Sequence, residues 1–188
     1  LARSTVSTLG LFTLIYGLAT PDQDALGILA HGSYKGALFL VAGIVEHATH
    51  TRDIRELGGL RRRMPVTFAV AVLAALSMAG IYPLLGFHAK EAFYESLLHG
   101  PVLARTGLQG PVLAACVAAN ALIIAAALRF VAGIFLGAPS RHAEHAHEAG
   151  PILWGPPAVL AGLALLLGLS APATEHMAAA FSSRPGAA

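Results

Sequence analysis

The fold is decided by an apolar stretch that carries one cation near its middle: Leu29-Ala30-His31-Gly32-Ser33-Tyr34-Lys35-Gly36-Ala37-Leu38-Phe39-Leu40-Val41-Ala42-Gly43. The wider segment 25–45 is long enough to cross a bilayer as a helix, because about 20 residues at 1.5 Å each span ~30 Å of hydrocarbon. A lysine at the centre of such a helix costs roughly 2.5 to 3.5 kcal/mol on insertion scales. A charge kept at that cost indicates an ion pathway or a proton relay, so Lys35 is the first candidate functional residue.

The composition of the 188-residue chain is that of an integral membrane protein. Hydrophobic residues make up 56% of it and charged residues 12%, and its mean hydropathy is +0.68. This leaves too little polar surface to coat a water-soluble domain. The net charge is only +2, so no nucleic-acid partner is expected. The one cysteine, Cys116, lies in an apolar run and is predicted to be a small buried side chain.

Five apolar segments predict an all-α membrane protein, a bundle of about five transmembrane helices. Strands cannot satisfy their backbone in lipid unless they close into a barrel, and no alternating barrel pattern is visible. The third segment is predicted to be broken, because Pro83 removes a backbone donor and Gly80 and Gly86 lower helix preference. We expect helices at 5–20, 25–45, 66–98 and 112–136 within a unit covering 1–136, then a His-rich cytoplasmic loop at 137–151, a helix at 152–170 and a flexible tail at 171–188.

The arginines predict an orientation, because basic residues accumulate in cytoplasmic loops. With the start of the first helix on the cytoplasmic side, eight of the ten arginines lie on or near that side. Leu1 is not an initiator methionine, and we expect the chain to be a fragment of a longer protein. The eight are Arg3, Arg52, Arg55, Arg61, Arg62, Arg63, Arg129 and Arg141, against Arg105 and Arg184 outside.

A line of ionisable residues is predicted along the second helix. His31 and Lys35 are four residues apart and so share one helix face, and at about 100° per residue Glu46 falls within roughly 20° of Lys35. Histidine exchanges protons near neutral pH, and lysine does so only when it is desolvated or close to another cation. His31, Lys35 and Glu46 are therefore candidate proton-path residues, with ordered water between the groups.

Lys90 and Glu91 are further candidates, because they follow the predicted break. A broken helix offers unwound carbonyls and half-helix ends, which transporters use as polar sites. Lys90 could instead reach the membrane surface, or pair with Glu91 or Glu95. Likewise His31 could make only a packing hydrogen bond, and Glu46 could belong to an ordinary helix end.

Two other polar groups have simpler explanations. The run Arg61-Arg62-Arg63 is most simply a determinant of topology. We expect no metal site, no cofactor and no catalytic residue. Residues with metal-like spacings are present before the last predicted helix, but without cysteines or a regular site pattern; they are His142, Glu144, His145, His147 and Glu148.

Three motifs resemble the antiporter-like membrane subunits shared by respiratory complex I and the Mrp sodium/proton antiporters. Residues 1–10 are similar to that family's LAYSTxSQxG segment, 31–40 to its HAxxKALLFL helix, and 86–91 to its GFxSKE broken helix. The stretch 51–60 resembles the large A subunit of Mrp more than complex I. The resemblance covers about residues 1–170 and implies the second half of the antiporter module.

The resemblance implies a subunit of a monovalent cation (Na⁺)/proton antiporter, not an enzyme, in the plasma membrane of a prokaryote. His31, Lys35 and Lys90 match the family's proton-path histidine and lysines, whereas a second histidine of some relatives is replaced here by Gly27. Implied partners are other subunits of the complex, membrane lipid, protons and Na⁺. The alternative is a proton-pumping membrane subunit of NADH-quinone oxidoreductase or of a membrane-bound hydrogenase.

Overall fold

The computed structural model describes residues 1–16, 21–99 and 101–170, and in that part of the chain all regular structure is helical. The chain therefore has the predicted all-α class. The helices are α1 (Ala2–Tyr16), α2 (Pro21–Thr49), α3 (Pro65–Ala79), α4 (Leu85–His99), α5 (Pro101–Thr106), α6 (Gln109–Phe135), α7 (Arg141–Glu144) and α8 (Pro151–Leu169), with short 3₁₀ turns at Ile54–Glu56 and Leu60–Arg62.

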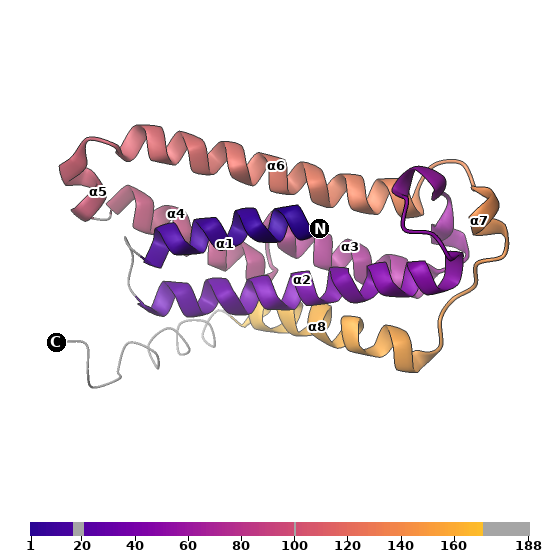
Figure 1. Ribbon diagram of the computed structural model, residues 1–188. Helices are drawn as coiled ribbons and strands as arrows, with labels where there is room; N and C mark the ends of the chain where they lie inside the picture. The colour runs from indigo at the N-terminus through magenta and orange to yellow at the C-terminus, as the bar shows by residue number, and fades with distance from the viewer. Residues whose placement is uncertain (17–20, 100, 171–188) are drawn as a thin grey trace.

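Helix α2 is the central element of the bundle. It packs against α1, α3, α4 and α8, and α6 lies on the other side of α3 (Figure 1). Its inward face is apolar, with Leu38 and Val41 fully buried, and joins a core that also contains Met78 and Phe135. This packing holds the middle of α2, and with it Lys35, inside the bundle.

The predicted break is present between α3 and α4. Helix α3 ends at Ala79, and Gly80 closes it in the left-handed conformation, with φ of 80°. The nitrogen of Ile81 donates to Leu76 O at 3.1 Å, which satisfies one carbonyl of the last turn. The chain then passes Pro83 and enters α4. The carbonyl end of α3 therefore lies within the bundle, where Ala79 O is available to a side chain.

Three of the described helical segments are long and apolar enough to cross a membrane alone: Ala25–Thr49, Gln109–Phe135 and Pro151–Leu169. Helices α1, α3 and α4 have only 15 residues each. The predicted first helix reaches Thr20, whose placement, like the predicted tail 171–188, lies outside the described residues. Helix α2 begins four residues earlier than predicted, because proline is well accommodated at a helix start. The short helices α5 and α7 were not predicted.

Six of the eight arginines predicted to be cytoplasmic lie at one end of the bundle, where α2 and α6 end and α3 and α8 begin (Figure 1); they are Arg52, Arg55, Arg61, Arg62, Arg63 and Arg141. Arg3 is an exception, because α1 begins beside the middle of α2 and not at that end. Two of the arginines there have acidic partners: Arg52 pairs with Glu46 at 2.6 Å and Arg55 with Asp53 at 2.6 Å. Hydrogen bonds from the side chain and backbone of Arg55 lower the pKa of Asp53 to about 2.

Glu148 caps the start of α3 from a distant part of the chain. Its carboxylate accepts hydrogen bonds from Val66 N at 2.7 Å, Thr67 N at 3.3 Å and Thr67 Oγ1. Met64, at the N-cap position itself, supplies no side-chain bond. A carboxylate at this position satisfies orphan donors and interacts favourably with the helix dipole.

Replacing Glu148 by alanine should therefore destabilise the protein by about 1 to 2 kcal/mol, the usual cost of losing a cap. Thermal unfolding of the purified complex measures the effect as a lower midpoint. Glu144→Ala is the matched control, because Glu144 is exposed four residues away. Equal midpoints for the two variants would show that the cap contributes nothing.

Candidate functional site

Lys35 is buried at the interface of α1 and α2, with 4% of its surface exposed. Its ammonium group donates to Ser4 Oγ at 2.5 Å and to Leu1 O at 3.4 Å, both on the α1 side. Among the side chains that the structure describes, no ion pair includes Lys35. The lysine is thus held by neutral oxygens inside an apolar bundle.

His31 makes its contacts with aromatic side chains. Its Nδ1 lies 3.1 Å from the Tyr34 hydroxyl, and its ring meets those of Phe12 and Tyr34 edge to face at 5.5 and 5.3 Å. His31 and Tyr34 are both buried. The nearest polar partner of the histidine is therefore Tyr34, three residues along α2, which sequence reasoning did not select.

Lys90 lies on α4 and reaches back to the break. Its Nζ donates to Ala79 O at 2.8 Å, a carbonyl at the end of α3. Gly80 makes room for this side chain, because a Cβ at Gly80 would stand 2.6 Å from Lys90 Cδ. Lys90 therefore neither pairs with the neighbouring glutamates nor extends to the surface.

The two glutamates among the candidates lie away from the lysines. Glu46 is at the loop end of α2, where it pairs with Arg52, and about 16 Å of helix separates it from Lys35. Glu91 is exposed on α4, with an oxygen 3.8 Å from His88 Nδ1. The common helix face predicted for Glu46 and Lys35 does not produce a contact.

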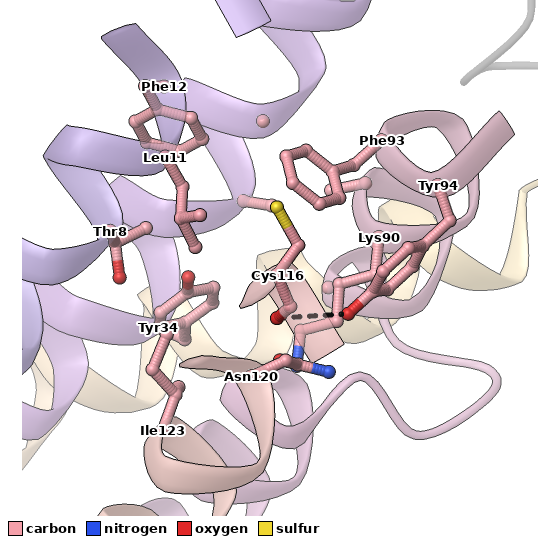
Figure 2. A pocket seen from close by; sticks show the side chains of 14 residues that line it. Thr8, Leu11, Phe12, Tyr34, Lys90, Phe93, Tyr94, Cys116, Asn120 and Ile123 are labelled. Atoms are coloured by element: carbon pink, nitrogen blue, oxygen red, sulfur yellow. Dashed lines mark hydrogen bonds between the residues drawn. The ribbon is translucent and has the colours of Figure 1, made fainter. Parts of the chain in front are cut away.

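A cavity lies between Tyr34 on α2 and Lys90 on α4 (Figure 2), and neither His31 nor Lys35 is among the described residues that line it. Counted as the space open to the centre of a water molecule, its volume is about 70 Å³, which is room for several waters. Both Tyr34 and Lys90 line it, together with side chains of α1 and α6. The cavity therefore places the hydroxyl that contacts His31 and the amine at the break around one space.

The far side of this cavity is also polar. The Tyr94 hydroxyl donates to Cys116 O at 3.5 Å, and the Asn120 amide lies beside it (Figure 2). Cys116 is buried, as predicted. Near the break, Ser77 Oγ is buried and has no partner among the described residues. Buried hydroxyls of this kind are commonly satisfied by ordered water.

The histidines and acids before α8 do not gather into a site in the described part of the chain. No group of three or more His, Cys, Asp or Glu side chains described there is arranged to hold a metal ion. Glu148, one of the residues with metal-like spacing, caps α3 instead.

The two-part helix, the lysines inside the bundle and the apolar spans are features of a multi-pass transmembrane module. Residues 1–105 match the family model described as NADH:quinone oxidoreductase/Mrp antiporter, TM, and the chain belongs to that family.

Among curated relatives, the chain is 35% identical over 192 residues to Na(+)/H(+) antiporter subunit A1 of Staphylococcus haemolyticus and 32% identical to that of Staphylococcus aureus. These matches cover 90% of this chain and 24% of each relative, so the chain spans about a quarter of their length.

Two solved structures share the fold. The membrane-bound sulfane sulfur reductase, an archaeal respiratory membrane complex, matches with a TM-score of 0.78 and 27% identity over 90% of this chain and 28% of that one. The Mrp complex from Dietzia sp. matches with a TM-score of 0.79 and 24% identity over 96% of this chain and 42% of that one. The family and the three described apolar helices long enough to span a bilayer identify the chain as a multi-pass membrane protein.

Proposed function

We propose that this chain forms the second half of the proton-translocating module in a multisubunit monovalent cation (Na⁺)/proton antiporter. The observation that carries the proposal is the cavity shared by Tyr34 and Lys90, which joins the His31 side of α2 to the helix break. Identity of 32 to 35% to antiporter subunits supports the antiporter over other members of the family. Its partners are the other subunits, lipid, protons and Na⁺, and the chain is a transporter part with no reaction of its own.

In this proposal protons pass between His31, Lys35 and Lys90 through water. Desolvation disfavours the charged form of an amine, so a buried lysine with only neutral acceptors can release its proton when a neighbouring charge changes. Glu46 and Glu91 would contribute little to this path, since Glu46 pairs with Arg52 at the loop end of α2 and Glu91 is exposed on α4. The arginine-rich end of the bundle faces the cytoplasm of a prokaryotic cell.

A proton pump driven by a redox reaction is the second candidate. The likeness to the archaeal respiratory complex, at 27% identity, favours it. Such a subunit would use the same buried lysines without binding a redox centre itself.

Everted vesicles containing the intact complex separate the two functions. A pH gradient is first established, and the antiporter is expected to dissipate it when Na⁺ is added. A redox-driven pump would build the gradient on addition of its electron donor and would not respond to Na⁺. Absence of a Na⁺ response in vesicles with correctly assembled complex would contradict the antiporter proposal.

Replacing Tyr34 by phenylalanine should lower Na⁺-dependent proton transport roughly fivefold. The hydroxyl that contacts His31 is lost while the ring is kept, and one hydrogen bond is worth about 1 kcal/mol. Tyr82→Phe is the matched control, because Tyr82 is 67% exposed in the loop of the break. The initial rate of gradient dissipation is the measurement, and a Tyr34→Phe rate equal to the control would remove Tyr34 from the path.

A further inference from the structure

A hollow lies at the basic end of the bundle, between the loop that precedes α3 and the loop that follows α6. Counted as the space open to the centre of a water molecule, its volume is about 490 Å³. Arg61 and Arg62 line one side, and Leu136 and Pro139 line the other. The hollow is separate from the cavity at Lys90 and is not used by the proposed proton path.

The walls of this hollow are fixed by contacts between the two loops. Gly59 N donates to Leu136 O at 3.1 Å, and Ser140 N donates to Gly58 O at 3.5 Å. A Cβ at Gly59 would stand 2.8 Å from Pro139 Cα, and its φ of 69° also favours glycine. The shape of the hollow is therefore set by direct contacts between the backbones of the two loops.

The guanidinium groups at the hollow have no acidic partners in the described part of the chain. Arg52 and Arg55 at the same end are paired with Glu46 and Asp53, whereas no described ion pair includes Arg61 or Arg62. Both side chains are exposed. Two arginines that line one hollow without an acidic partner among the described residues can supply several N–H donors to a phosphate.

A largely apolar surface, interrupted by the exposed Arg129, leads from the hollow along α6. Leu128 is 65% exposed and Leu136, the C-cap residue of the helix, is 38% exposed, and both lie on the same broad side of α6. Helix α6 is long and apolar enough to span the membrane. The hollow thus stands where a span ends, with cationic groups at the level of the headgroups and apolar groups below.

We propose that this hollow binds the phosphate headgroup of an anionic phospholipid, whose acyl chains lie along the Leu128 side of α6. The charge complementarity and the apolar surface together favour a lipid over a soluble anion or an acidic neighbouring subunit. The proposal rests on the membrane location and is independent of what the complex transports.

The test uses the intact complex in discs of neutral phosphatidylcholine, titrated with phosphatidylglycerol, with the thermal midpoint as readout. The double variant Arg61→Gln/Arg62→Gln is expected to need about tenfold or more anionic lipid for half of the stabilisation. Arg61→Lys/Arg62→Lys should keep most of the effect, and Arg105→Gln, an exposed arginine at the opposite end, should keep all of it. High salt should weaken the effect in the unmodified complex.

Three results would overturn the proposal: an unchanged titration for the double glutamine variant, full stabilisation by soluble glycerophosphate, or loss of a neighbouring subunit from that variant during purification. An unchanged titration would show that the arginines do not bind the lipid. Stabilisation by glycerophosphate would indicate a site for a free anion, and loss of a subunit would indicate a protein contact. If the glutamine variant does not accumulate, the glycerophosphate and salt arms on the unmodified complex decide.

Discussion

Lys90→Ala should abolish Na⁺-dependent dissipation of the pH gradient in vesicles that contain the assembled complex, with a rate at least about tenfold below the unmodified protein. The variant loses the lysine that lines the cavity in the described part of the chain, and with it the bond to Ala79 O. Removing a group that must carry a proton in the path typically costs 10²-fold or more in proton-transfer steps. Glu95→Gln is the control, because Glu95 is exposed on the same helix.

Lys90→Arg separates a proton carrier from a structural group. An arginine keeps a positive donor for Ala79 O, but a guanidinium is not deprotonated in proteins. We therefore expect Lys90→Arg to assemble normally and to transport as poorly as Lys90→Ala. Recovery of transport in the arginine variant would indicate that Lys90 acts only by stabilising the helix break. Lys35→Ala and Lys35→Arg distinguish a proton carrier from a structural group at Lys35 in the same way.

The second large effect is expected from Gly86→Ala, which should prevent normal accumulation of the complex. A Cβ at Gly86 would overlap the backbone oxygen of Ser77, so α4 would have to move away from α3. Added methylenes in a packed interior cost about 1 to 3 kcal/mol, and a backbone obstacle cannot rotate aside. The amount of assembled complex in the membrane and its thermal midpoint are the measurements.

Gly43→Ala is the matched control for this variant. Gly43 also lies within a helix, but a Cβ there meets nothing within 4 Å. Alanine is favoured over glycine in helices by about 0.5 to 1 kcal/mol, so Gly43→Ala should be neutral or slightly stabilising. Similar behaviour of the two variants would show that the close approach at Gly86 is not required.

The break illustrates what local sequence can predict. Gly80, Pro83 and the following Lys90 indicated a two-part helix with charge beside it, because proline and glycine act on the backbone where they stand. Gly86 was expected only to weaken the helix, yet it lies inside α4 and allows α3 to approach. That role depends on a neighbour that the local pattern does not identify.

For Lys35 and His31, too, the sequence predicted the position of each residue but not its partner. Burial of Lys35 followed from the apolar residues around it, and helical periodicity placed His31 on its face. Their actual partners, Ser4 for the lysine and Tyr34 for the histidine, depend on rotamers and on how α1 packs against α2. The spacing of three between His31 and Tyr34 was a usable signal, whereas nothing local indicated Ser4.

The contact between Glu148 and the start of α3 also has a consequence for the order of assembly. The bonded residues are 82 positions apart in the chain for Val66 and 81 for Thr67. During synthesis α3, α4 and α6 must all emerge before Glu148 does, and long-range contacts form only after the intervening loop has closed. The N-terminal end of α3 is thus completed late, by a residue made just before the last described helix.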